Sequence, residues 1–129
     1  MKKEIIYTKD APQPIGPYNQ AVKVGKTLYV SGQIPLIPGI MKLVNDDLEK
    51  ETIQVMKNLE AILLNANMTF DNVVKTTIFL SDMSNFEKIN KTYGRYFKPE
   101  RALARETVEV SNLPKFVRLE ISVIACEVD

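Results

Sequence analysis

The sequence predicts an α+β fold in which two helices pack on one face of a β-sheet. Segments 47–65 and 84–97 repeat apolar residues at helical spacing, and the other apolar segments are short enough for strands. In segment 117–125 every second residue is apolar, whereas the residues between them are mixed. Because two helices cannot cover both faces of such a sheet, we expect both on the uniformly apolar face.

The N-terminal part of the chain predicts a strand followed by a hairpin. Residues 4–8 form a short first strand, after which several prolines interrupt regular structure. Residues 19–24 and 27–31 predict the hairpin, because Gly25 occupies the first central position of a two-residue turn, as in a type II′ turn. Residues 34–44, which contain two prolines and a glycine, are expected to form a loop.

The longer helix is expected over residues 47–65. Asp46 followed by Glu49 resembles a capping box, in which a side chain accepts a hydrogen bond from the first helical turn. Asn67 is expected to end the helix in the left-handed conformation usually taken by glycine. The apolar face comprises Leu48, Thr52, Val55, Met56, Leu59, Ile62 and Leu63.

A strand and the shorter helix follow. The strand spans residues 72–80, and the side chains expected on one of its faces are Val74, Thr76, Ile78 and Leu80. Ser84 and Glu87 have the spacing of a capping box at the start of the helix, and Pro99 ends it. Its apolar stripe consists of Phe86, Ile89, Tyr93 and Phe97.

Composition bounds the class of protein. The 129 residues have the length of one domain, which we expect to span residues 1–129, and 45% of them are hydrophobic. We expect no signal peptide, and no apolar run approaches the ~20 residues that a membrane helix needs. The single cysteine, Cys126, cannot form an internal disulfide, which fits a reducing cytoplasm.

Composition also excludes several chemistries. The chain has no histidine and one cysteine, so neither a structural zinc site nor a Ser-His-Asp or Cys-His nucleophile pair is available. Its glycines form neither a dinucleotide motif nor a phosphate-binding loop. The formal net charge of +1 gives no electrostatic footprint for nucleic acid.

The strongest chemical signal is an arginine and a glutamate on two neighbouring predicted strands. Arg105 and Glu120 are separated by the turn at residues 111–115. Arginine holds a small carboxylate by two charge-assisted hydrogen bonds, and glutamate can carry a proton. The alternative is structural, because Arg105 could simply form an ion pair with Glu120 or Glu109.

The last strand also predicts an interface. The face opposite the helices is expected to carry Arg118, Glu120, Ser122, Ile124 and Cys126, together with Tyr29 and Phe79. A face that mixes aromatic, aliphatic and polar side chains suggests contact with another subunit.

A set of short motifs follows in order along nearly the whole chain: IGPYNQAV (15–22), SGQIP (31–35), VKTTIFL (74–80), Asn90 with Tyr93, Ala104-Arg105 with TVEV (107–110), LPK (113–115) and Glu120-Ile121. Together these motifs resemble the Rid (YjgF) family of reactive intermediate deaminases. The resemblance implies a chorismate-mutase-like α+β fold, a homotrimer and ligand clefts between subunits. It also implies hydrolysis of 2-aminoacrylate and related enamines or imines to a 2-keto acid and ammonia, with no metal and no organic cofactor.

The resemblance further implies roles for individual residues. Arg105 is expected to clamp the substrate carboxylate, Glu120 to activate the attacking water, and the backbone around Thr107 to help hold that water. The other residues expected at the cleft are Tyr18, Ser31, Gly32 and Asn90.

The chain departs from the family pattern beside its key arginine. Leu103 stands where a proline is common, and Glu106 stands where a small residue is common. In an extended strand Glu106 should point away from Arg105. Two other functions stay open: a non-catalytic regulator that binds small carboxylates in the same cleft, and an endoribonuclease or translation inhibitor, which the charge balance disfavours.

Overall fold

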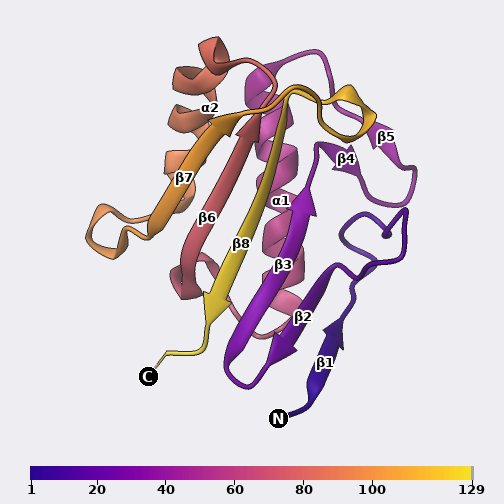
Figure 1. Cartoon of the computed structure of the whole chain (residues 1–129), viewed down its shortest axis with the longest axis vertical. Coiled ribbons are helices and arrows are strands. Elements are labelled where there is room, and N and C mark those ends of the chain that lie inside the picture. The colour runs from indigo at the N-terminus through magenta and orange to yellow at the C-terminus, as the bar shows by residue number, and fades with distance from the viewer. Residues whose placement is uncertain (129) are drawn as a thin grey trace.

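A six-stranded mixed sheet forms the centre of the molecule in the computed structural model, which describes residues 1–128. The strands lie in the order β1-β2-β3-β8-β6-β7, and only β6 and β7 run parallel. Helices α1 and α2 both lie on one face of the sheet (Figure 1), which confirms the predicted α+β arrangement. The bounds are β1 Lys3–Ile6, β2 Ala21–Val24, β3 Thr27–Gln33, α1 Leu48–Asn65, β6 Val73–Leu80, α2 Phe86–Tyr93, β7 Ala104–Glu109 and β8 Leu119–Cys126.

The strand order corrects one expectation about the site. Strands β7 and β8 are consecutive in the sequence, but β6 lies between them in the sheet. Arg105 and Glu120 are therefore not on neighbouring strands of the sheet. The parallel β6–β7 connection crosses over through α2, and this places β7 at the edge beyond β6.

The segment expected to be a loop contains a small hairpin. Strands β4 (Leu36–Ile37) and β5 (Lys42–Leu43) pair antiparallel, so the prediction of an irregular loop was wrong. Leu36 is buried in a small apolar cluster with Leu113 and Val117, and this distant contact stabilises a hairpin that the local sequence does not indicate.

The N-cap of helix α1 lies one residue later than predicted. The Oδ1 atom of Asp47, not of Asp46, accepts a hydrogen bond from the Lys50 N–H at 3.0 Å. At the other end Asn67 has φ 59°, which confirms the left-handed termination.

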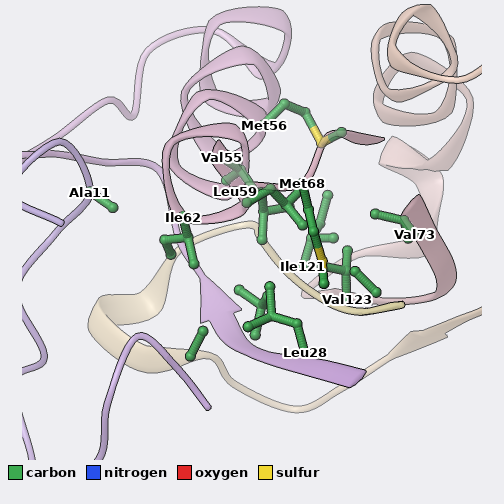
Figure 2. Packing of buried hydrophobic residues seen from close by; sticks show 14 of the residues in the cluster. Ala11, Leu28, Val55, Met56, Leu59, Ile62, Met68, Val73, Ile121 and Val123 are labelled. Atoms are coloured by element: carbon green, nitrogen blue, oxygen red, sulfur yellow. The ribbon is translucent and has the colours of Figure 1, made fainter. Parts of the chain in front are cut away.

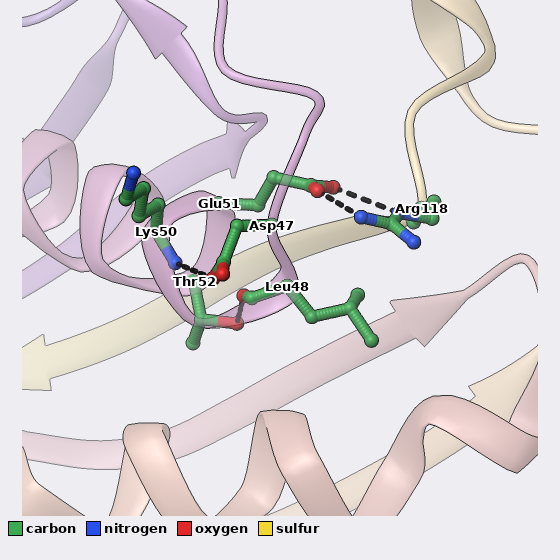
Figure 3. A network of polar contacts seen from close by, with 6 residues as sticks. All are labelled: Asp47, Leu48, Lys50, Glu51, Thr52 and Arg118. Atoms are coloured by element: carbon green, nitrogen blue, oxygen red, sulfur yellow. Dashed lines mark hydrogen bonds and ion pairs between the residues drawn. The ribbon is translucent and has the colours of Figure 1, made fainter.

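An ion pair joins the first turn of α1 to the residue before β8. Figure 3 shows Glu51 facing the guanidinium of Arg118, whose Nε donates to Oε1 at 3.1 Å and whose Nη2 contacts Oε2. Glu51 is buried, so its charge is compensated by Arg118 rather than by water. The prediction that Arg118 lies on the open face with Glu120 was wrong, because the guanidinium turns toward α1.

The start of α2 also differs from its predicted cap. The carboxylate of Asp82 accepts from the Ser84 N–H at 2.9 Å and begins a short 3₁₀ turn at Met83–Asn85. Helix α2 begins only at Phe86, and no side chain caps it, so the Ser84–Glu87 capping box was wrong. Its apolar stripe is confirmed, since Ile89 and Tyr93 are buried and Phe97 packs against the core.

The hydrophobic core lies between α1 and the sheet. Figure 2 shows Val55, Leu59 and Ile62 of α1 turned toward side chains of β3 and β8. Strand β8 alternates strictly between buried and half-buried residues, as predicted. In β6 the pairing with β8 shifts between Val73 and Lys75, so Val73 rather than Val74 is buried together with Thr76, Ile78 and Leu80, which corrects the predicted face.

Two negative findings apply to residues 1–128. None of their helices is both long enough and apolar enough to cross a membrane. Their His, Cys, Asp and Glu side chains form no group of three or more that could hold a metal ion.

Candidate functional site

Arg105 is exposed on the edge strand β7 and is held by side chains of α2. Its Nη1 donates to Oδ1 of Asn90 at 2.6 Å. Its Cζ atom lies 5.3 Å from the ring centre of Tyr93 and 5.6 Å from that of Phe86. The guanidinium is thus oriented by one hydrogen bond and two aromatic faces, and it keeps further N–H donors for a carboxylate.

This arrangement tests the structural alternative for Arg105. Within residues 1–128 Arg105 forms no ion pair, with Glu120, Glu109 or any other acid. Instead, Oε1 of Glu109 accepts a hydrogen bond from the Met83 N–H at 2.8 Å. Within one copy of the chain, the alternative of an ion pair with either glutamate was therefore wrong.

The pairing of β6 with β7 decides which way Arg105 and Glu106 point. Arg105 is opposite Thr76, a buried residue on the helix side of β6, and so lies on that side. Glu106 lies on the opposite side, where its carboxylate pairs with Lys75 at 3.1 Å. The expectation that Glu106 points away from Arg105 is confirmed.

Thr107 follows Arg105 on the same face of β7. It is opposite Ile78, another buried residue of β6. Among residues 1–128 its Oγ1 is the one buried side-chain polar atom without a hydrogen-bond partner. A buried hydroxyl in this state costs free energy, so a bound ligand or water that paired with it would be favoured.

Glu120 is half-buried on the open face of β8, opposite Phe79 of β6. Burial raises the pKa of its carboxyl above the ordinary glutamate value. The side chain packs directly over Gly32: a Cβ atom placed on Gly32 would lie 2.7 Å from Cδ of Glu120. Here β3 and β8 shift register, between Val30 and Gln33.

Ser31 and Tyr18 lie near Gly32. The Ser31 hydroxyl donates to the carbonyl of Asn19 at 2.6 Å, which holds the loop before β2 against β3. Tyr18 and Gly32 line one small cavity, and the Tyr18 side chain is 48% exposed. The Ser31 contact supports a structural role for its hydroxyl.

The predicted site residues therefore form two groups in one chain. Arg105, Asn90 and Thr107 lie on the helix side of β7 or on α2, whereas Glu120 lies with Gly32 on the other side of the sheet. A single chain does not bring the guanidinium and this carboxylate together.

Two residues without a predicted functional role also contribute to the site. Phe86 and Tyr93 were predicted as core residues, Tyr93 also within the family motif that contains Asn90, and their rings support the Arg105 guanidinium. Their spacing from Asn90, four residues before it and three after it, places all three on one face of a helix, and this was the available signal.

A cleft of about 430 Å³ opens beside Arg105. Its lining residues include Tyr93, Phe97, Lys98, Pro99 and Leu103. Leu103, the departure from the family pattern, is thus part of a mostly apolar surface that ends at the guanidinium.

Comparisons with known proteins agree on the family. The family model described as endoribonuclease L-PSP matches residues 8–127. A Rid-family protein of Yersinia pestis, YyfA, is 50% identical and superposes with a TM-score of 0.94 over 98% of this chain and all of that chain. Reactive Intermediate Deaminase A of Arabidopsis thaliana is 41% identical over 97% of this chain and 66% of its own.

A third relative was solved with a small molecule. Escherichia coli TdcF, with bound serine, is 36% identical and has a TM-score of 0.91, over 98% of this chain and all of that chain. The family model covers residues 8–127, and these relatives match nearly the whole chain. The chain therefore belongs to the endoribonuclease L-PSP family, which is the Rid (YjgF) family that its motifs resemble.

Proposed function

We propose that this protein is a cofactor-free deaminase that hydrolyses 2-aminoacrylate and related 2-imino acids to 2-keto acids and ammonia. The observation that carries the proposal is the state of Arg105, exposed yet held by Asn90 and by two aromatic rings, with no acid paired to it within residues 1–128. Such an arginine suits a small carboxylate. The relative named reactive intermediate deaminase and the relative with bound serine support the same class of ligand.

The site is completed by a second copy of the chain in this proposal. Arg105 and Glu120 lie on opposite sides of the sheet, so a cleft that uses both takes Arg105 from one copy and Glu120 from another. The open face suits such an assembly, since Ile5, Val22, Tyr29 and Ile124 are paired side by side across four strands. A homotrimer with clefts between subunits, as the family resemblance implies, meets this requirement.

The reaction needs few groups. Arg105 binds the substrate carboxylate, and Glu120 takes a proton from a water as its oxygen attacks the imine carbon. Glu120 then returns this proton to the nitrogen, which gives a carbinolamine. It next takes the hydroxyl proton of the carbinolamine and delivers it to the amino group, so that the carbon–nitrogen bond breaks and ammonia leaves as the carbonyl forms. The raised pKa of Glu120 strengthens it as a base, and the unpaired Thr107 hydroxyl is available to the water.

We place this activity in the cytoplasm. The single cysteine, Cys126, is half-buried and free, and a reducing compartment keeps it so. Enzymes that use pyridoxal phosphate release 2-aminoacrylate from serine or cysteine, and such an enzyme would supply the substrate.

The test is a coupled assay in which a pyridoxal-phosphate dehydratase generates 2-aminoacrylate and keto-acid release is followed. The wild type should speed release, and Arg105→Ala should abolish the acceleration while the variant keeps its fold and assembly. Arg101→Ala is the matched control, because Arg101 is exposed in the adjoining turn and should leave the rate unchanged. Full activity in a folded Arg105→Ala variant would sink the mechanism.

A binding measurement distinguishes the deaminase from the non-catalytic alternative. If the wild type does not speed release but calorimetry shows that it binds pyruvate, and Arg105→Ala does not, the protein is a carboxylate-binding regulator. If it neither turns over the imine nor binds a keto acid, both readings of the Arg105 site fail.

A further inference from the structure

The cleft beside Arg105 is larger than the smallest substrates need. Its volume is about 430 Å³, within the range of sites that enclose whole small-molecule ligands. The side chain of 2-iminopropanoate is a single methyl group, which would leave most of this space unfilled. The cleft lies on the same side of the sheet as the Arg105 guanidinium, because both are bounded by Tyr93.

The lining of the cleft indicates the chemistry of its occupant. Tyr93, Phe97, Pro99 and Leu103 present aromatic and aliphatic surface, whereas the charged residues are Arg105 and Lys98, both cations. No acidic side chain lines it among residues 1–128. The matching ligand has one anionic end and one apolar end.

We infer that the cleft formed by Tyr93, Phe97, Pro99, Ala102 and Leu103 takes the side chain of the substrate and selects 2-imino acids with branched aliphatic or aromatic side chains. This inference rests on the proposed function. With the carboxylate on Arg105, a substrate side chain of leucine or phenylalanine size enters the cleft. The imine carbon stays outside it, where Glu120 of another copy can direct a water.

Burial of the substrate side chain in the cleft determines the expected difference in kcat/KM between two imines. Each methylene group moved from water into an apolar pocket changes selectivity by about tenfold or more. The leucine-derived imine should therefore exceed the alanine-derived imine in kcat/KM by at least about tenfold.

The experiment generates each imine from its L-amino acid with an amino-acid oxidase and compares hydrolysis by three proteins. The wild type should prefer the leucine-derived imine. Ala102→Trp, which fills the cleft from an exposed position, should bring the ratio of the two kcat/KM values close to one while the alanine-derived imine is still hydrolysed. Leu64→Trp adds the same indole at an exposed position of α1 that does not line the cleft, and it should keep the wild-type ratio.

A wild-type ratio near one, or a ratio that Ala102→Trp leaves unchanged, would overturn the inference. Calorimetry with pyruvate and with 4-methyl-2-oxopentanoate tests the cleft without turnover. If neither imine is hydrolysed faster but the branched keto acid binds more tightly, and only Ala102→Trp removes the difference, the proposed deaminase fails and the cleft assignment survives. Equal binding of both keto acids would defeat the assignment by itself.

Discussion

Gly32 of β3 and Glu120 of β8 are in direct contact, and the contact depends on the absence of a side chain at residue 32. A Cβ atom on Gly32 would lie 2.7 Å from Cδ and 2.9 Å from Oε1 of Glu120, closer than such atoms approach in proteins. The absence of a side chain at Gly32 therefore leaves the half-buried space that the Glu120 carboxylate occupies. Burial there raises the pKa of Glu120.

Gly32→Ala should separate activity from stability. The clashing atoms are the end of a flexible side chain, so Glu120 can rotate away and the melting temperature should change little. The displaced carboxylate no longer meets the attacking water, and keto-acid release should fall by about a hundredfold, as expected for a misplacement of about 1 Å. Because the carboxylate also becomes more hydrated, the acid limb of the pH–rate profile should move to lower pH. An unchanged rate and an unchanged acid limb would show that Gly32 does not position Glu120.

Glu120→Gln should make the protein more stable at neutral pH. The folded state raises the pKa of Glu120, so it binds this proton more tightly than the unfolded chain does. The free energy of unfolding of the wild type accordingly falls as pH rises from the ordinary to the raised pKa. Glutamine stays neutral at every pH. The melting temperature of Glu120→Gln should therefore exceed that of the wild type by its largest amount above the raised pKa, and the difference should vanish below about pH 4. A gain that did not depend on pH would contradict desolvation as its cause.

Thr107→Val should increase the free energy of unfolding. It should also slow keto-acid release in the coupled assay, because the hydroxyl proposed to be available to the attacking water is lost. The valine keeps the shape of threonine but removes a buried hydroxyl that has no partner within residues 1–128. Urea denaturation should show a gain of about 1 kcal/mol in the free energy of unfolding. Thr52→Val is the matched control with the opposite sign, because the buried Thr52 hydroxyl donates to the Leu48 carbonyl at 2.8 Å (Figure 3). A loss of stability in both variants would mean that the Thr107 hydroxyl is bonded in the assembled protein.

Arg118→Met should be more damaging than Glu51→Gln. Removal of the guanidinium leaves the buried carboxylate of Glu51 without its partner, which should cost about 3 kcal/mol in the free energy of unfolding. In Glu51→Gln the half-exposed Arg118 can turn to water, so the loss should be smaller. The double variant should recover part of the loss of Arg118→Met, and a purely additive double variant would argue against coupling of the pair.

Much of the fold follows from local features of the sequence. Gly25 adopts φ 61° at the predicted hairpin turn, and Asn67 ends α1 as expected. The alternation of β8 and the apolar stripe of α2 were also predicted correctly. Each of these depends on residues close together in the chain, where side-chain period and turn chemistry decide the backbone.

Two predictions that depended on the exact position of a single residue were wrong by one position. The cap of α1 is Asp47 rather than Asp46, and a shift in β6 buries Val73 rather than Val74. Adjacent residues of similar chemistry offer nearly equal local choices, so the packing of the whole element selects between them.

The sequence by itself determined which residue types are available for chemistry: an arginine and a glutamate in a chain without histidine, set in family motifs. Their roles in catalysis are still predictions. Only the tertiary structure decided that β6 separates β7 from β8, that Arg105 meets Asn90 and Tyr93, and that Glu120 packs on Gly32. Strand order and the side of the sheet that a residue faces result from contacts between distant segments, which local periodicity does not encode.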